Sequence, residues 1–514
     1  MMTAVLLAWA VLLCIRFSSS AGPLWRDEAN SAAQAGLAEW SDLWSSLQYD
    51  SFPVLYPSAL RLWISCPFLA GDRGLRVLGL CVGMAALLSV WLVSRTLHSP
   101  EPLVSLALVS IDPVFVSESC SIRPHGLGVV FLLWVYHAQW RCFMLPSAPR
   151  ILMSAMLSIL AVQASYNSAI FIGVFGISSA VISFARGEGR KGVRMLVPGA
   201  CAALSLLPYS EALRKAQNWV ALLHCRVSWR EFFDACIARH TIAYPAVWAA
   251  VLVLAAFCIL RRLRHPAEEA SPPPALHYTL MSAAMGLVCQ VLFIQWIGIP
   301  PFPRYLLPVL VLAAFAFQSV IGNSARRFQF FLVIAVMLAT GRHAWSSLGL
   351  RRTNADHVAM RVSQEARSPD LIVVSPWFLH PSFARYYQGD ACWVTVPLLP
   401  HSPITRYDLF RSAMMARDPS AAIAETLSAA MRSGGRVWLV HQVIGWVPGG
   451  DDALEVPPPP ESPDGHDYVR FRSYWERDIW HRLRSCCSPQ EVALPASDNV
   501  WEEERLRLTL FRKR

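Results

Sequence analysis

The sequence contains few charged residues for its length. Only 16% of its 514 residues are Asp, Glu, Lys or Arg, whereas about 25% is usual in a soluble protein. Hydrophobic residues make up 54% of the chain, and the mean hydropathy is +0.38. This composition excludes an ordinary soluble globular protein and predicts an α-helical polytopic membrane protein.

The sequence also lacks motifs for binding metals or nucleic acids. None of its 13 cysteines shows a CxxC or Cys/His metal spacing, and the first polar segment has no Asp-x-Asp motif. We therefore predict no required metal, although a divalent ion is left open. The net charge is +10, but the arginines cluster in short loops between apolar segments, which favours orientation in a lipid bilayer over a nucleic-acid partner. Adjacent Cys486 and Cys487, with Cys392 upstream, leave a disulfide open.

Long apolar runs are concentrated in the first two-thirds of the chain. Residues 343–514 instead carry the charges, prolines and short strand patterns of a soluble domain. We predict a transmembrane domain over 1–342, with an outer first loop over 18–75, and an extracytoplasmic α/β domain over 343–514. About eleven transmembrane helices are expected, over 3–17, 76–97, 102–117, 124–140, 151–165, 168–185, 193–209, 244–260, 277–297, 305–322 and 328–343.

Two further apolar segments are ambiguous. Met1–Ile15 could be a signal peptide cleaved near Ser18–Ala21, but it has no basic n-region, so a retained first helix is favoured. Phe52–Ala70 carries Arg61 and two internal prolines. We predict that it lies on the outer face as an interfacial helix.

The basic loops predict the orientation of the chain. All of these loops lie on the same side of the membrane only if Phe52–Ala70 does not cross the bilayer. The positive-inside rule makes that side cytoplasmic. We therefore expect a multi-pass protein of the cell (inner) membrane with a cytoplasmic N-terminus and an extracytoplasmic C-terminal domain. The 210–243 loop, which also carries basic residues, is a mild exception. The basic loops contain Arg95; Arg141 and Arg150; Arg186, Arg190, Lys191 and Arg194; Arg261, Arg262 and Arg264; and Arg326 and Arg327.

The tail shows strand and helix patterns. Asp370–Ser375 and Arg436–Val440 are predicted as buried strands, and Ala421–Arg432 as a helix. A second helix is expected through Phe383–Tyr387. Residues Arg505–Arg512 alternate like an edge strand. The aromatic residues Trp377, Tyr386, Tyr387 and Trp393 could stack on a sugar, but packing in the domain core is favoured.

An acidic pair, Asp27-Glu28, directly follows the first apolar segment, and Asp50 lies downstream. Two adjacent carboxylates at a membrane face are costly to desolvate, and a carboxylate can act as a general base. The alternative is a pair of solvated loop acids that cap a helix over 29–36, because acids are common at helix starts. From composition alone this alternative is favoured.

Two arginine motifs are expected on the same outer face. The first is Glu118-Ser-Cys-Ser-Ile-Arg123-Pro-His125, and the second is Pro300-Pro-Phe-Pro-Arg304-Tyr305. Arginine suits a phosphate through bidentate hydrogen bonds and a fixed charge. The alternatives are arginines that reach the headgroups or pair with Glu118, and a plain interfacial His125. Carboxylates that could act as a base and arginines that could bind an anion are thus expected on the same face. Together they indicate an enzyme that transfers a group from a phosphate.

The chain resembles the GT-C glycosyltransferase superfamily, in particular the bacterial family 39-like enzymes: protein O-mannosyltransferases, lipid A aminoarabinose transferase and Rgt-type lipopolysaccharide glycosyltransferases. The matching features are the acidic pair, an amphipathic helix at Phe52–Trp63, an Arg-led span at Leu75–Gly79, the turn Ser119–Leu127 and the stretch Arg304–Pro308. The likeness covers about residues 20–130 well and 290–310 moderately. His125 stands where these relatives have Tyr, and Cys120 and Ser121 where they often have an acid.

The resemblance implies an inverting transferase that takes a sugar from a polyprenyl-phosphate donor and passes it to an extracytoplasmic protein, lipid or glycan. Asp27 would be the base and Glu28 an orienting acid. Arg123, Arg304, His125 and Tyr305 would bind the donor phosphate, and Asp50 and Glu118 would be secondary acids. Two alternatives stay open: a transporter or flippase of envelope precursors, and a non-catalytic GT-C-like scaffold.

Overall fold

The structure is a computed structural model that describes residues 2–97, 101–220, 248–249, 251–253, 274–298, 301–321, 326–443, 455–458, 468–495 and 499–514. The predicted span over 244–260, the 210–243 loop and the following cytoplasmic linker with Arg262 lie largely outside these residues. The chain divides into two compact units. The helical unit comprises Met1–Ser19, Ser51–Glu211 and Arg226–Gly349, and the α/β unit comprises Ser20–Asp50, Ala212–Cys225 and Leu350–Arg514.

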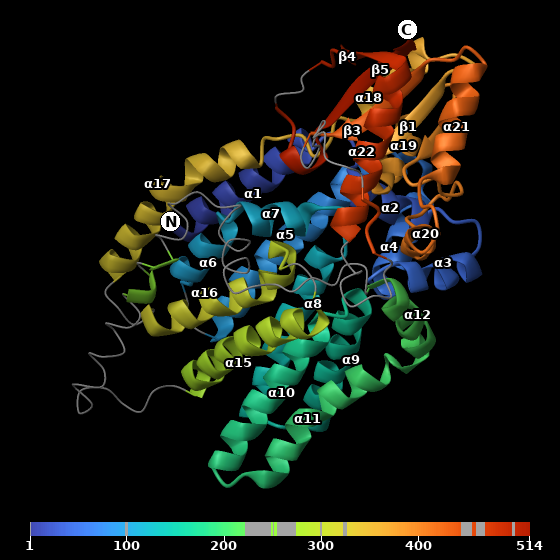
Figure 1. Cartoon of the computed structure of the whole chain (residues 1–514). Coiled ribbons are helices and arrows are strands. Elements are labelled where there is room, and N and C mark those ends of the chain that lie inside the picture. Colours follow the sequence, from blue (N-terminus) through green and yellow to red (C-terminus); the bar gives the residue numbers. More distant parts are fainter. Residues whose placement is uncertain are drawn as a thin grey trace. The chain divides into compact units, whose positions relative to one another are not determined.

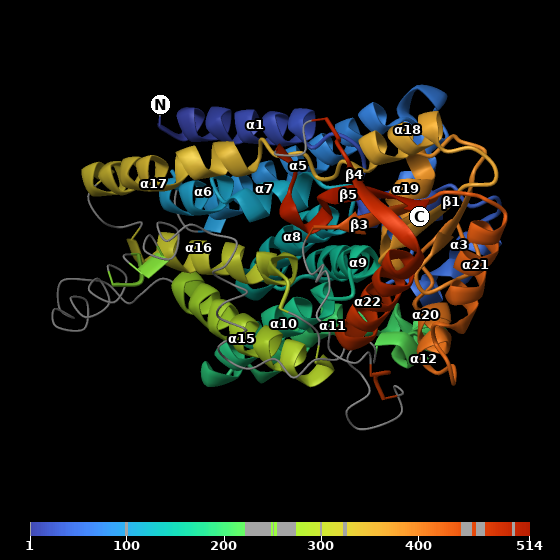
Figure 2. The same ribbon diagram turned by 45° about the horizontal axis from the view of Figure 1, so that its top comes forward.

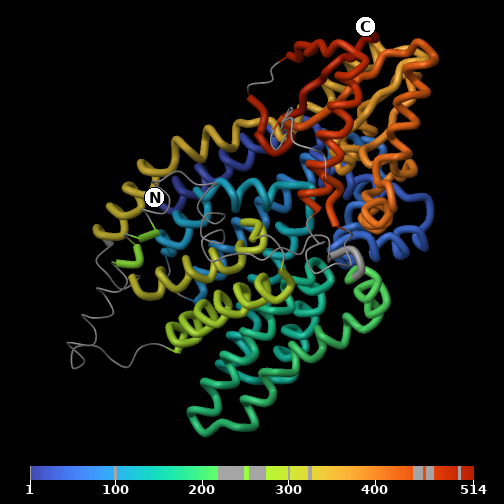
Figure 3. The backbone as a smooth tube through the Cα atoms, viewed as in Figure 1, coloured from blue at the N-terminus to red at the C-terminus, as the bar shows by residue number. Residues whose placement is uncertain are grey.

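The helical unit consists of long apolar helices. Seven helices of the described chain are long and apolar enough to cross a membrane, or eight if one bent pair counts as a span; the predicted count of about eleven is not confirmed. Neighbouring helices pack as hairpins, as α10 and α11 do in Figures 1 and 3. Its described helices include α1 (Met2–Ser20), α4 (Leu55–Ile64), η2 (Pro67–Leu69), α5 (Asp72–Leu97), α6 (Leu103–Ser110), α7 (Pro113–Cys120), α8 (His125–Met144), α9 (Ala148–Ala164), α10 (Ser168–Ala185), α11 (Gly189–Leu204), η3 (Leu207–Tyr209), α15 (Pro274–Ile297), η5 (Pro303–Leu306), α16 (Leu307–Ile321) and α17 (Arg326–Ser347).

The first and last of these helices lie side by side (Figure 2). Trp9 of α1 stacks on Trp345 of α17 with ring centroids 5.8 Å apart, and the guanidinium group of Arg16 lies 5.2 Å from the same ring. The helix α4 has ten residues and is therefore about 15 Å long. This is too short to cross a hydrocarbon core of about 30 Å, as expected for Phe52–Ala70.

The predicted span over 102–117 is not one continuous helix: it is a bent pair that forms either a broken span or a re-entrant loop. Helices α6 and α7 are bent by 69° at a short break. Asp112 caps α7, because its Oδ1 accepts a hydrogen bond of 2.8 Å from the N–H of Phe115, and Pro113 occupies the first turn. A capping Asp followed by Pro starts a new helix, since proline has no N–H to continue the preceding one.

Two glycines of α5 allow α7 to approach closely. A Cβ atom at Gly79 would collide with the carbonyl oxygen of Cys120, and one at Gly83 would collide with the Cys120 Sγ. Small residues four apart on a membrane helix permit this kind of backbone contact. The contact fixes the end of α7, which leads directly into the turn that carries Arg123.

The α/β unit is built on a five-stranded sheet with the order β2-β1-β3-β5-β4. The central β1 (Leu371–Ser375) is parallel to β2 (Cys392–Thr395) and β3 (Val437–Gln442), and β5 (Leu506–Lys513) is antiparallel to β3 and to β4 (Cys487–Val492). Strands β1 and β3 are buried along their whole length, as expected for parallel strands covered on both faces. Helix α21 (Ala421–Arg432) packs on β3, while α18 (Ala355–Glu365) and α22 (Tyr468–Cys486) pack on β5 (Figure 1).

The tail predictions are confirmed for β1, β3, α21 and α19 (His380–Tyr386). The prediction that 505–512 forms an edge strand is wrong, because β5 lies between β3 and β4. Its central residues are buried on both faces, and the exposed β4 forms the edge instead. The disulfide that the sequence left open is absent among the described cysteines: Cys392, Cys486 and Cys487 are free, and the last two sulfur atoms are 3.8 Å apart.

Candidate functional site

The acidic pair lies in the first turn of helix α2 (Arg26–Ala35). The Glu28 side chain is fully buried, whereas the Asp27 side chain keeps 24% of its surface exposed, with an oxygen 3.7 Å from the Nε of Arg26. Trp25 precedes the helix in an extended conformation and makes no side-chain cap. The alternative of two solvated acids is therefore wrong for Glu28. Asp27 is the member of the pair that solvent, and hence a substrate, can reach.

The cap of this helix comes from Glu504, in the short helix η8 (Glu502–Glu504) near the other end of the chain. Both oxygens of its fully buried carboxylate accept hydrogen bonds from the N–H of Arg26, at 3.1 and 2.9 Å, and Oε1 accepts a third of 2.7 Å from the Ser382 hydroxyl. An anion at a helix N-terminus satisfies a free N–H and interacts favourably with the helix dipole. Glu504 thus holds the turn that carries Asp27.

Two more hydrogen bonds tie this segment to the C-terminal part of the unit. The N–H of Leu24 donates to the Tyr386 hydroxyl at 2.6 Å, and the N–H of Thr405 donates to Asn30 Oδ1 at 2.7 Å. Sequence reasoning identified Asp27 and Glu28 but missed Glu504. The only sign of it in the sequence is the acidic run that ends there.

The Glu504→Gln variant should change the pH dependence of stability. Burial, with a smaller contribution from Asp27, raises the pKa of Glu504 to about 7, although Arg26 and the Ser382 hydroxyl lower it. Since the folded pKa exceeds the usual value of 4.5, stability is greatest below about pH 4.5 and falls as pH rises toward 7. The full effect is roughly 3 kcal/mol. The amide of the variant cannot ionise, so we expect the variant to match the wild type at pH 5 and to exceed it in unfolding temperature at pH 8.

Unfolding of the full-length protein in detergent, followed at both pH values, measures this difference. Glu502→Gln is the matched control, because Glu502 is exposed on the same short helix. Equal shifts for the two variants at both pH values would mean that Glu504 is not the group responsible.

The arginine motifs meet in the helical unit. His125, Arg304 and Tyr305 line one small recess together with Asn167 and neighbouring apolar residues. His125 is only 7% exposed, and its Nε2 and the Asn167 Oδ1 are buried without a hydrogen-bond partner among the described residues. Buried polar atoms are normally hydrogen-bonded. The recess therefore presents polar groups arranged for a ligand.

Arg123 does not line this recess, but ring contacts connect it to His125. Its guanidinium group lies 4.8 Å from the centroid of Phe52, whose ring packs edge-on against His125 at 5.2 Å. Arg304 lies 5.6 Å from the Tyr305 centroid, and the Tyr305 ring is 6.2 Å from His125. Both guanidinium groups interact electrostatically with the His125 ring. Because arginine suits a phosphate, these two residues are the candidates for a phosphate site.

The other predicted residues do not line this recess. Glu118 is buried in the last turn of α7 in the helical unit, and Asp50 directly follows η1 (Leu47–Tyr49) in the α/β unit. Trp377 is in the core of the α/β unit, and Tyr386, Tyr387 and Trp393 pack against it, as the core alternative states. Within the described chain, no cluster of three or more His, Cys, Asp or Glu residues could hold a metal ion.

Comparison with solved structures identifies proteins of similar fold. No protein-family model matches the sequence, and no curated protein is similar to it in sequence. Among solved structures, ArnT from Cupriavidus metallidurans bound to undecaprenyl phosphate is similar over 99% of this chain and 97% of its own, with a TM-score of 0.55 and 11% identity. The archaeal oligosaccharyltransferase AglB from Archaeoglobus fulgidus, in complex with an inhibitory peptide and a dolichol-phosphate, is similar over 86% of this chain and 69% of its own, with a TM-score of 0.50 and 11% identity.

These likenesses confirm the predicted fold class. The chain shares with ArnT the fold of a multi-pass helical membrane protein with a C-terminal α/β domain. The roles of individual side chains follow from their own geometry and chemistry.

Proposed function

We propose that this protein is an integral-membrane glycosyltransferase that moves a sugar from a polyprenyl-phosphate donor to an acceptor outside the cytoplasm. The recess that brings His125, Arg304 and Tyr305 together, with Arg123 beside it, is the observation that carries the proposal. The shared fold with ArnT bound to undecaprenyl phosphate and with AglB bound to dolichol-phosphate supports it. No metal enters the proposed step.

The reaction is a displacement at the anomeric carbon of the donor sugar. Asp27 takes the proton of the acceptor as its nucleophilic atom attacks, and the bond from the anomeric carbon to the phosphate oxygen breaks with inversion. The lipid phosphate leaves with the bonding electron pair. Arg123 and Arg304 stabilise the negative charge that builds on it. Glu28, which is buried, orients the turn that carries Asp27.

Mass spectrometry of envelope lipids and glycans from cells with and without the protein tests the function. We expect one glycan, lipid or glycoprotein to lose a single sugar in the cells that lack it, and a complementing Asp27→Asn gene to leave that loss uncorrected. An unchanged envelope, combined with no release of lipid phosphate from polyprenyl-phosphate sugars by the purified protein, would contradict the proposal.

The proposed topology makes a separate prediction. Because the basic loops are all expected on one side of the membrane, we expect Arg190 and Arg326 in the cytoplasm and the 343–514 region outside. Arg262 is expected in the cytoplasm too. Single cysteines placed at these positions in a cysteine-free background should be labelled by a membrane-impermeant maleimide only after lysis, and one at Glu502 should be labelled in intact cells. The reverse pattern would overturn both the orientation and the site of the reaction.

A further inference from the structure

Three sulfur atoms meet in the α/β unit, where helix α22 passes into strand β4. Cys486 is the last residue of α22, Cys487 is the first residue of β4, and Met431 lies in the last turn of α21. The Met431 Sδ is 3.2 Å from the Cys486 Sγ and 3.6 Å from the Cys487 Sγ, and the two Sγ atoms are 3.8 Å apart. The sulfur atoms thus form a closed triangle, although Met431 and Cys486 are 55 positions apart in the sequence.

This triangle has nearly the size that a bound metal ion requires. A metal–sulfur bond is about 2.3 Å long, so three sulfur ligands around one ion lie roughly 3.8–4.0 Å from one another. The two cysteine sulfur atoms already have this separation. The Met431 sulfur needs to move outward by less than about 1 Å, which an unbranched thioether side chain does by rotating its own bonds.

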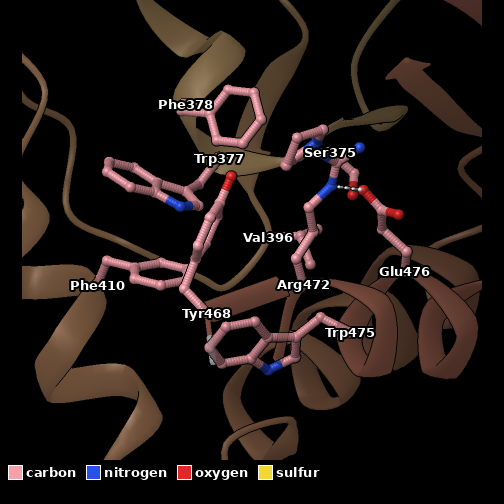
Figure 4. Close-up of a pocket in the computed structure, with 10 residues that line it drawn as sticks. Ser375, Trp377, Phe378, Val396, Phe410, Tyr468, Arg472, Trp475 and Glu476 are labelled. Atoms are coloured by element: carbon pink, nitrogen blue, oxygen red, sulfur yellow. Dashed lines mark hydrogen bonds and ion pairs between the residues drawn. The ribbon is translucent and has the colours of Figure 1, made fainter. Parts of the chain in front are cut away.

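The helix that ends at Cys486 is held by core side chains (Figure 4). Trp475 of α22 packs edge-on against Phe410 of α20 (Tyr407–Met414), with ring centroids 5.4 Å apart. One turn of the same helix is tied by a 2.8 Å hydrogen bond from Arg472 Nε to Glu476 Oε1. The backbone of the cysteine pair is therefore positioned before an ion binds, which lowers the cost of ordering the ligands.

Basic residues at the end of β5 lie beside the two cysteines. Lys513 is the partner of Cys487 in the β4–β5 ladder, and the N–H of Arg514 donates a 3.2 Å hydrogen bond to the carbonyl oxygen of Cys486. Both basic side chains interact electrostatically with the Cys487 thiol. Two thiolates around a monovalent cation leave one negative charge, which these basic side chains offset.

The chemistry of the three ligands favours a soft, monovalent ion. Thiolates and thioethers select copper(I), whereas structural zinc sites use four ligands, drawn from Cys, His, Asp and Glu. Within the described ranges no third His, Cys, Asp or Glu joins the two cysteines to form a metal site. Cys487 is 1% exposed, but Cys486 and Met431 are partly exposed, so an ion can reach the triangle from the surface.

We propose that Cys486, Cys487 and Met431 bind one copper(I) ion in a three-sulfur site. Binding releases one proton from each thiol. The ion joins the end of α21 to the junction of α22 and β4, so it stabilises the α/β unit. The site lies at the end of β5 that is remote from Glu504, because β5 begins two residues after Glu504 and ends at Lys513. The ion takes no part in the proposed sugar transfer.

Copper binding to the reduced, full-length protein in detergent tests this site. Copper(I) is supplied anaerobically as its acetonitrile complex, and equilibrium dialysis gives the number of bound ions. We expect the double variant Cys486→Ser, Cys487→Ser to bind one copper(I) fewer per chain than the wild type. X-ray absorption of the wild type with one equivalent of copper should show three sulfur ligands at about 2.3 Å.

Met431→Leu tests the third ligand without removing a thiol. Leucine conserves the volume of methionine, so the fold should persist. We expect copper(I) to bind at least about tenfold more weakly, since even groups that only support a metal ligand contribute ten- to a hundredfold to affinity. Copper(I) should also raise the unfolding temperature of the wild type and leave that of the double cysteine variant unchanged.

Cys392→Ser and Met415→Leu are the matched controls, because both residues are exposed in the same unit. Each should bind copper(I) like the wild type, and an equimolar amount of Zn²⁺ should not displace the copper. Equal copper content in the wild type and the double cysteine variant would overturn the site. Wild-type affinity in Met431→Leu would exclude the thioether as a ligand, and displacement by Zn²⁺ would contradict the assignment to copper(I).

Discussion

Sugar transfer by the Asp27→Asn variant should fall by about 10²–10⁴-fold, the usual contribution of a general base. Asparagine keeps the shape of the side chain but cannot take the proton of the acceptor. Asp27 keeps part of its surface exposed in the first turn of α2, so the change should leave the fold intact. The rate of transfer from a purified polyprenyl-phosphate sugar, measured at saturating donor, gives the result directly.

Helix capping is separated from catalysis by the same substitution. Asn caps a helix about as well as Asp, and Glu504 already holds the N–H of Arg26. A variant with normal transfer would therefore remove Asp27 from the chemistry and leave Asp50 or Glu118 as the base. Glu28→Gln is the companion variant. Because Glu28 is buried, we expect a smaller loss from it, together with a lower unfolding temperature.

Replacement of Arg123 or Arg304 by alanine should weaken use of the donor by about ten- to a hundredfold each. A charge-assisted hydrogen bond to a phosphate contributes roughly 1.5–3 kcal/mol. Arg304 lines the recess, and Arg123 lies over the Phe52 ring that packs on His125, so the loss should appear in the KM for the donor and in the release of lipid phosphate. Initial rates over a range of donor concentrations separate these two quantities.

Arg194→Ala, an exposed arginine of α11, is the matched control and should behave like the wild type. The double variant should lose more than either single variant, since both arginines stabilise the same leaving group. Wild-type kinetics from both single variants would exclude these arginines from the donor site.

Local sequence signals predicted much of this fold and picked out the acidic pair and the two arginine motifs of the candidate site. Alternating and continuous apolar patterns placed β1, β3 and α21 within a residue or two. The break between α6 and α7 was missed, although Asp112-Pro113 is itself a helix-start signal. The apolar residues continue on both sides of Asp112-Pro113, so the segment was predicted as one span. Hydropathy alone does not indicate a change of helix direction.

The central position of β5 and the capping role of Glu504 could not be predicted from the neighbouring sequence. An alternating strand looks like an edge strand whether or not another strand covers it, and β4 pairs with it from a segment rich in polar residues. Glu504 acts on Arg26 across 478 positions of the sequence. A buried carboxylate with a partner so distant leaves no periodic pattern, so only the structure reveals it.

The long separation between Glu504 and Arg26 also sets an order of assembly. A ribosome that adds about 5–20 residues per second needs roughly 25–100 s to progress from Arg26 to Glu504. During that time the membrane helices encoded between them emerge and insert, while the acidic helix has no cap. Tyr386 and Thr405, which hold Leu24 and Asn30, also arrive late. The turn that carries Asp27 is therefore completed only after the membrane helices have been synthesised, which delays the positioning of the proposed base until the nascent protein is almost finished.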